Sequence, residues 1–110
     1  MNSEFQQLYQ TIVDRKKQAQ EGSYTAYLFD KGIEKILKKV GEECTEVVIA
    51  AMKEENHSEI VCEISDLLYH IFVLMVEKDI SFEDICKELE KRSKKTSNLK
   101  PERRQIEEFR

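Results

Sequence analysis

The chain has 110 residues, 36% of them charged, with only three glycines and one proline. This length fits one domain, and the scarcity of turn-forming residues favours long helices over a sheet. Residues 1–86 carry 9 basic and 17 acidic side chains, whereas residues 87–110 carry 9 basic and 5 acidic ones. The acidic body argues against general nucleic-acid binding, so we expect no nucleic-acid partner.

The cysteines and the hydropathy pattern predict a cytoplasmic protein. Cys44, Cys62 and Cys86 are odd in number and form no C-x-x-C pair, which indicates reduced, mostly buried thiols. The first ten residues lack the apolar centre of a signal peptide. The longest apolar run, 71–76, is too short to span a bilayer. We therefore expect no membrane association.

Three helices are predicted in the first half of the chain. Apolar residues at helical spacing predict a helix over 4–20, ended by Gly22. Ser23 is expected to cap a short helix to about residue 29, followed by a turn at 30–32. A long helix follows over 33–54. At 100° per residue, Glu43 falls at the edge of its apolar stripe, where a carboxylate is partly dehydrated and needs a partner.

The next helix, about 58–78, is apolar around most of its circumference. Asn56 with Glu59 forms a predicted capping box at its start. One narrow polar stripe contains Glu63, Asp66, His70 and Glu77. A helix of this kind is buried nearly all round, which in so short a chain predicts a subunit interface.

A last helix is predicted over 82–95, capped by Ser81 with Asp84. The prediction is an all-α helical bundle of about four to five helices, with its core completed by dimerisation. Residues 1–95 would form the domain, and residues 96–110 a basic C-terminal tail.

Two acidic clusters carry the chemical information. Glu42, Glu43 and Glu46 form an EExxE pattern, and Glu63 and Asp66 form ExxD after a gap of 16 residues. Side chains three or four apart share a helix face, and the gap allows an antiparallel partner helix. Facing carboxylates repel one another unless a cation lies between them. Oxygen ligands alone predict Mg²⁺, with Mn²⁺ as a substitute.

Some of these carboxylates also fit a solvent-exposed role. Glu42 fits a solvated helix face about as well as a functional position. A ferritin-like di-iron site would need Glu-x-x-His pairs, which the chain lacks. His70 is expected to be a packed, hydrogen-bonded histidine more readily than a group supporting the metal.

The chemistry expected of such a site is phosphoanhydride hydrolysis. Protein-bound Mg²⁺ usually meets substrate phosphates and can orient a water for attack. Glu42 could accept the proton of that water, and Lys39, one turn before Glu43, could reach phosphate oxygens. The chain has no P-loop sequence. These residues predict Mg²⁺-dependent hydrolysis in an all-helical oligomer.

Three sequence blocks closely resemble the phosphoribosyl-ATP pyrophosphohydrolase family, within the all-α NTP pyrophosphatase (MazG-like) superfamily. They are SYTAYLF (23–29), KILKKVGEECTEVVIAA (35–51) and EISDLLYHIFVLM (63–75). The resemblance covers roughly residues 5–93. It implies hydrolysis of phosphoribosyl-ATP to phosphoribosyl-AMP and pyrophosphate, the second step of histidine biosynthesis, by a helical dimer. Cys44 stands where alanine is common, and the tail after Lys95 matches no pattern.

The resemblance also implies residue roles. The expected Mg²⁺ ligands are Glu43, Glu46, Glu63 and Asp66, with Glu42 as the water-activating base or an outer-shell group. Phosphate contacts are expected from Lys35 and Lys39, and nucleotide contacts from Tyr24 and Thr25. A separate cyclohydrolase is expected to act next.

Two alternatives remain open at this point. A house-cleaning nucleotide pyrophosphatase of the same fold would act on dUTP, dCTP or an abnormal nucleotide. A non-enzymatic helical module would use its acidic stripe to bind a basic partner.

Overall fold

The computed structural model describes residues 3–53 and 56–95. These residues form five helices: α1 (Ser3–Lys17), α2 (Tyr24–Lys31), α3 (Ile33–Met52), α4 (His57–Glu77) and α5 (Phe82–Ser93). No strand occurs in these ranges, so the all-α prediction and the number of helices are confirmed. The predicted tail, 96–110, lies outside the described residues. None of the described helices is long and apolar enough to cross a membrane.

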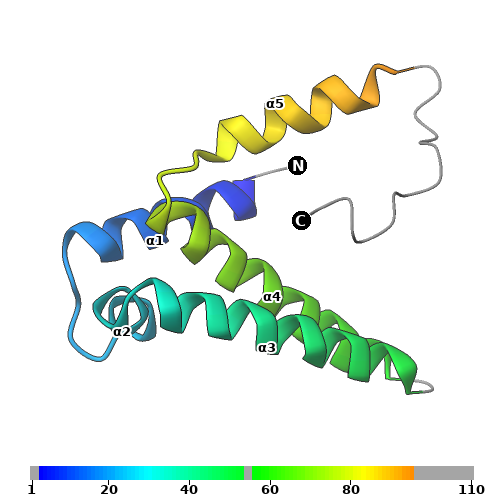
Figure 1. The fold of residues 1–110 in the computed structure, drawn as a ribbon, viewed down its shortest axis with the longest axis horizontal. Coiled ribbons are helices and arrows are strands. Elements are labelled where there is room, and N and C mark those ends of the chain that lie inside the picture. Colours follow the sequence, from blue (N-terminus) through cyan, green and yellow to red (C-terminus); the bar gives the residue numbers. More distant parts are fainter. Residues whose placement is uncertain (1–2, 54–55, 96–110) are drawn as a thin grey trace, which may run out of the picture.

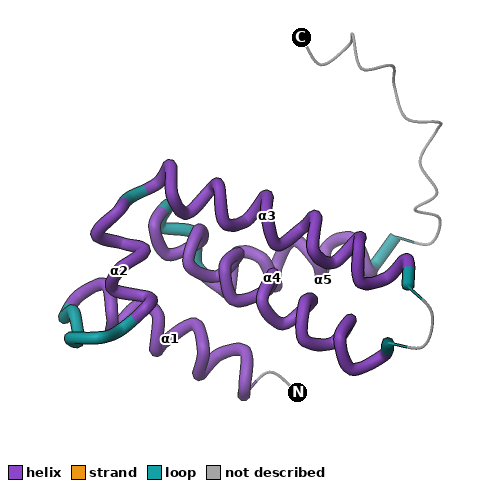
Figure 2. The backbone as a smooth tube through the Cα atoms, turned by 90° about the horizontal axis from the view of Figure 1, so that it is seen from below, coloured by secondary structure: helices purple, strands orange, loops and turns teal. Residues whose placement is uncertain are grey.

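The two long helices α3 and α4 lie antiparallel and side by side (Figure 1). They contain the two acidic clusters of the sequence. α1 packs along α4, and the short α2 lies at the end of the bundle where α3 begins (Figure 2). α5 leaves the end of α4 and diverges from α3. The bundle is therefore closed at the α2 end and open at the other.

The core lies where α1, α2 and α3 meet the C-terminal half of α4. Ile12, Leu28, Ile36 and Val73, one from each of these helices, are completely buried. Burial of one such side chain stabilises the fold by about 1.5–3 kcal/mol. Ile12 and Ile36 belong to the apolar spacings from which the helices over 4–20 and 33–54 were predicted, and both lie in this core. This packing holds α2 beside the middle of α4.

The connection between α2 and α3 consists of Gly32 alone. Its φ of 94° is a conformation that side chains with a Cβ rarely adopt. Its N–H bonds to Leu28 O at 2.9 Å, which ends α2. At the other end of α2, the Ser23 hydroxyl accepts a hydrogen bond from Ala26 N at 3.1 Å, as the predicted cap requires. α2 extends to Lys31, so of the predicted 30–32 turn only Gly32 lies outside a helix.

Two predicted helix ends differ from the structure. α1 ends at Lys17, well before Gly22. Asn56 precedes α4, but its side chain caps no N–H of that helix, so the predicted capping box is wrong. Its amide nitrogen instead donates to Ala50 O at 2.8 Å and to Glu59 Oε1 at 3.3 Å. The Asn56 side chain thus bonds to a carbonyl group at the end of α3 instead of capping α4. This bond links α3 to the start of α4.

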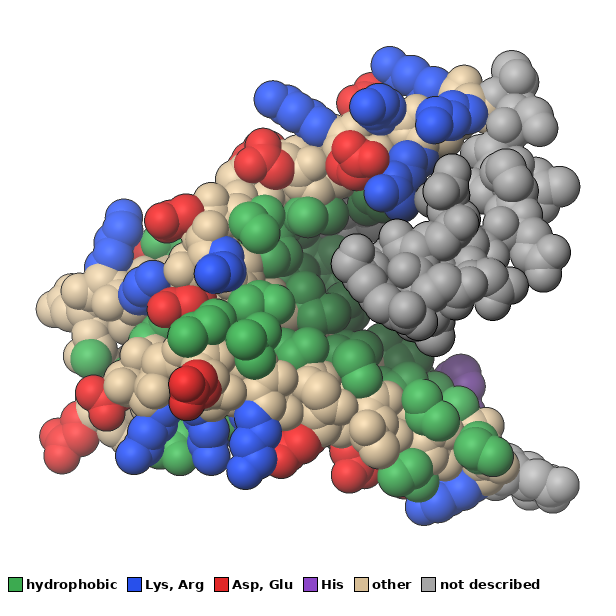
Figure 3. Space-filling view, in the orientation of Figure 1, with side chains coloured by type: hydrophobic (Ala, Val, Ile, Leu, Met, Phe, Trp, Pro, Cys, Tyr) green, Lys and Arg blue, Asp and Glu red, His purple; other side chains and the backbone are tan. Residues whose placement is uncertain are grey.

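The cap of α5 agrees with the prediction, and most of the apolar face of the helix is exposed. Ser81 Oγ accepts from Asp84 N at 3.0 Å. Phe82 packs against Phe72 and Tyr9. The other apolar side chains of α5 are exposed, Ile85 to 40% and Leu89 to 58%. Apolar side chains line a hollow between α5 and the α3–α4 pair (Figure 3).

The outer halves of α3 and α4 also present apolar side chains to solvent. The exposed set is Val48, Ile49, Met52, Val61 and Ile64. The burial predicted around the whole of 58–78 is therefore limited, within one chain, to the C-terminal half of α4. Cys44, Cys62 and Cys86 are exposed free thiols, and the prediction that they are mostly buried is wrong. Their helices each keep one face that no described helix covers.

Candidate active site

Three carboxylates meet between α3 and α4. Glu43 comes from α3, and Glu63 and Asp66 come from neighbouring turns of α4. One oxygen from each lies within 4.8 Å of the other two. Glu43 is largely enclosed, with 13% of its side chain exposed. The antiparallel helix pair thus brings the EExxE and ExxD patterns together, as their spacing predicts.

The remaining two acidic residues of the prediction lie outside this group. Glu46 is exposed and is not among the three clustered carboxylates. Its charge still reaches the group, because it contributes to a raised pKa at Glu63. Glu42 forms an ion pair with Lys39, in which Oε1 of Glu42 lies 3.3 Å from Nζ of Lys39.

The carboxylate group concentrates negative charge. Partial desolvation raises the pKa of the Glu63 carboxyl above its usual value, and nearby negative charges raise it further. Those charges belong to Asp66, Glu46, Glu43 and Glu59, in decreasing order of effect. The site therefore disfavours its own fully ionised state, and a bound cation would relieve this repulsion.

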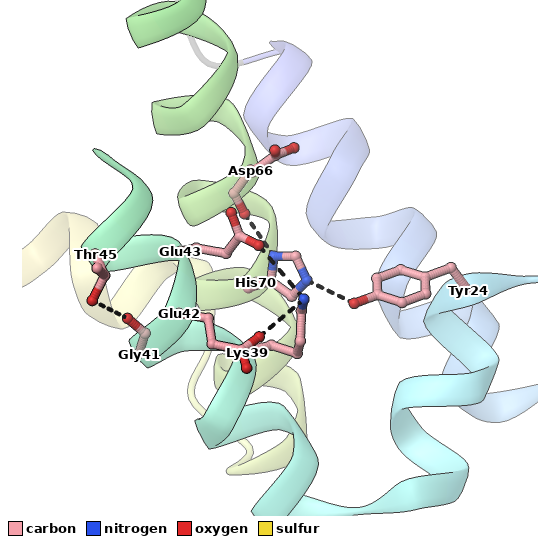
Figure 4. Close-up of polar contacts among 8 residues, drawn as sticks. All are labelled: Tyr24, Lys39, Gly41, Glu42, Glu43, Thr45, Asp66 and His70. Carbon is pink, nitrogen blue, oxygen red and sulfur yellow. Dashed lines mark hydrogen bonds and ion pairs between the residues drawn. The ribbon is translucent and has the colours of Figure 1, made fainter. Parts of the chain in front are cut away.

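Lys39 supplies positive charge beside Glu43, the α3 member of the three-carboxylate group (Figure 4). Its Nζ lies 3.3 Å from Glu42 and 3.7 Å from Glu43. Desolvation lowers the pKa of Lys39, but the hydrogen bond to Glu42 and the nearby charges outweigh it and leave the pKa raised. The ammonium group stays charged at neutral pH and can bind a phosphate oxygen.

α2 places Tyr24 and Thr25 at the edge of this group. Tyr24 OH lies 3.1 Å from Nε2 of His70, and Thr25 Oγ1 hydrogen-bonds the hydroxyl of Tyr69. The rings of Tyr24 and Tyr69 stack with centroids 6.1 Å apart. Burial raises the pKa of the Tyr24 hydroxyl, which the charge of Lys39 partly offsets. The charges of Lys39 and of the acidic group therefore both act on this hydroxyl.

Tyr27 extends the aromatic surface away from the carboxylates. It stacks on Tyr24 with centroids 6.0 Å apart, and Lys35 Nζ lies 6.0 Å from its centroid. Tyr24 and Tyr27 also line a surface cavity of about 600 Å³. Tyr27 is not among the residues predicted for the site, although residues three apart on a helix share a face. Lys35 thus lies beside this aromatic surface, one helical turn before Lys39 on α3.

The fold and the site together define an all-α protein with a carboxylate group suited to a divalent cation. Residues 5–93 match the family model described as Phosphoribosyl-ATP pyrophosphohydrolase. The chain belongs to the phosphoribosyl-ATP pyrophosphohydrolase family, as its sequence blocks predict.

Named relatives agree with this assignment. A phosphoribosyl-ATP pyrophosphatase of Clostridium novyi (strain NT) is 58% identical over 102 residues, covering 93% of this chain and 92% of the relative. One from Listeria innocua is 60% identical over 90 residues, covering 82% and 85%. The histidine biosynthesis bifunctional protein HisIE of Caldanaerobacter subterraneus is 62% identical over 88 residues, covering 80% of this chain and 42% of that protein.

Proposed function

We propose that this protein hydrolyses phosphoribosyl-ATP to phosphoribosyl-AMP and pyrophosphate, in the second step of histidine biosynthesis, with Mg²⁺ as cofactor. The family match over residues 5–93 supports the substrate. The observation that carries the metal-dependent chemistry is the meeting of three carboxylates within 4.8 Å between α3 and α4.

The donor set fits a hard divalent cation. Glu43, Glu63 and Asp66 offer only oxygen ligands, which suit Mg²⁺ and Mn²⁺ better than zinc or copper. Glu46 is proposed as a fourth ligand, since its charge already acts on Glu63. When bound, Mg²⁺ would neutralise phosphate oxygens and activate a water.

Lys39 and Glu42 are proposed to act as a pair. In the ion pair, Lys39 Nζ and Glu42 Oε1 are 3.3 Å apart. A substrate phosphate would compete for the ammonium group and so release the carboxylate. Glu42 would then accept the proton of the water that attacks phosphorus, and pyrophosphate would leave with the electrons of the cleaved anhydride bond.

The aromatic surface on α2 is proposed to hold the rest of the nucleotide. Tyr24 lies next to the acidic group, and 44% of the residue is exposed. Thr25 is tied to Tyr69 and fixes the start of α2 against α4. Lys35, beyond Tyr27, would contact a phosphate at the far end of the substrate.

We propose a cytoplasmic homo-oligomer, at least a dimer. The exposed apolar side chains Val48, Met52 and Val61 lie together on the outer halves of α3 and α4, with Met52 81% exposed. Contiguous exposed apolar surface marks an interaction site. A second copy of the chain would cover this surface.

The test is pyrophosphate release from phosphoribosyl-ATP, ATP, dUTP and dCTP in parallel, each with Mg²⁺ and with EDTA. We expect turnover of phosphoribosyl-ATP only, abolished by EDTA. Turnover of dUTP or dCTP instead would assign the protein to nucleotide house-cleaning. No turnover of any of the four would overturn the enzymatic proposal and favour the helical interaction module.

A further inference from the structure

His70 is the only buried polar or charged residue among the described residues, with 5% of its surface exposed. It lies on α4, one turn after Asp66, and its ring packs edge-on against both Tyr24 and Tyr69. Both ring nitrogens have partners. Nδ1 lies 2.7 Å from the backbone oxygen of Asp66, and Nε2 lies 3.1 Å from Tyr24 OH. The ring thus connects the ligand-bearing turn of α4 to α2 (Figure 4).

These contacts fix the direction of both hydrogen bonds. A backbone carbonyl can only accept, so Nδ1 of His70 carries the proton that is donated to Asp66 O. In this tautomer Nε2 is an acceptor, and the Tyr24 hydroxyl donates to it. The Tyr24 oxygen consequently presents only lone pairs to the site. A substrate group that meets it must be a donor, such as a sugar hydroxyl or an amino group.

We propose that His70 is a positioning residue for substrate binding. By accepting from Tyr24, it holds the tyrosine ring at the edge of the carboxylate group and turns the hydroxyl oxygen into an acceptor for a donor group of the substrate. This inference rests on the proposed function of the site. The bond to the Asp66 backbone sets the orientation of the imidazole, and the bond to Tyr24 carries the functional effect.

Two substitutions separate the two bonds. In His70→Gln, the longer side chain places its amide oxygen near the position of Nε2, where it can accept from Tyr24. In His70→Asn, the shorter side chain places its amide nitrogen near the position of Nδ1, where it can donate to Asp66 O. Tyr24→Phe removes the hydroxyl itself. Each purified variant would be assayed for KM and kcat with phosphoribosyl-ATP and for its melting temperature.

We expect His70→Asn and Tyr24→Phe each to raise KM roughly fivefold to tenfold, as the loss of one hydrogen bond implies, with little change in kcat. The double variant should show no further rise, and His70→Gln should keep KM within about twofold of wild type. Equal KM changes in the Asn and Gln variants, or additive effects in the double variant, would overturn the inference. Absence of turnover in the wild type would instead refute the proposed function, and this inference with it.

Discussion

We predict that Mg²⁺ stabilises the folded protein and that replacing Glu43 by Gln removes most of this stabilisation. Glu43 is the only α3 residue in the three-carboxylate group, and 13% of its side chain is exposed. Without its charge, the cation would be held by Glu63 and Asp66 of α4, with only the exposed Glu46 remaining as a proposed ligand on α3. The connection that the cation makes between the two helices would then be much weaker.

The size of the effect follows from binding linkage. A cation that binds only the folded state at ten times its Kd stabilises that state by about 1.4 kcal/mol. For a domain of this size, that corresponds to a rise in melting temperature of about 5–10 °C. We expect this rise in the wild type and its loss in Glu43→Gln. Catalysis should fall at least a hundredfold or so, since even groups that support metal ligands contribute about tenfold to a hundredfold.

The assay is thermal unfolding during a Mg²⁺ titration, with EDTA as the starting state. Glu34→Gln is the matched control, because it removes one exposed carboxylate from the same helix, outside the acidic group. Glu42→Gln should keep the Mg²⁺-dependent rise while losing kcat, since its partner is Lys39. A wild-type rise that persists unchanged in Glu43→Gln would refute the assignment of this ligand.

Three further predictions concern stability. In EDTA at pH 7, Glu63→Gln should have a higher melting temperature than wild type, and the difference should disappear on acidification. The pKa of Glu63 is raised in the folded state, so the contribution of this carboxyl to stability is present at low pH and is lost as pH rises through the folded-state pKa. A lower melting temperature of the variant at pH 7 would contradict this. Ser23→Ala should lower the free energy of unfolding by about 1 kcal/mol in urea titrations, through loss of the α2 cap, and an unchanged midpoint would argue against the cap. Leu28→Ala should lower it by roughly 2–5 kcal/mol, because the side chain is completely buried, and a loss well under 1 kcal/mol would disprove that packing.

Local patterns predicted the helices and most of the carboxylate group. Apolar periodicity depends on each helix alone, so it located α3 and α4 and their core residues, including Ile36. The turn between them is short, which forces an antiparallel pair. The EExxE and ExxD spacings therefore sufficed to place Glu43 opposite Glu63 and Asp66. Ser23 and Ser81 cap their helices through contacts three residues away, which sequence alone can indicate.

Features that depend on contacts between helices could not be predicted in this way. Asn56 bonds to the end of α3 instead of capping α4, because a tertiary partner outcompetes the local one. The exposure of Cys44 and Cys62 depends on which helix faces remain uncovered after packing. Likewise, Glu46 lies outside the acidic group although it shares the EExxE spacing, because helical spacing does not determine where a side chain points. The link from His70 to Tyr24 spans 46 residues and requires the fold.

The most direct test of the central claim is to identify the products formed from phosphoribosyl-ATP by the purified protein, using ³¹P NMR, in Mg²⁺ and in EDTA. We predict equal amounts of phosphoribosyl-AMP and pyrophosphate in Mg²⁺, and intact substrate in EDTA and with Glu43→Gln. Release of single phosphate, or the same products in EDTA, would contradict a metal-dependent cleavage between the α- and β-phosphates at the carboxylates of α3 and α4.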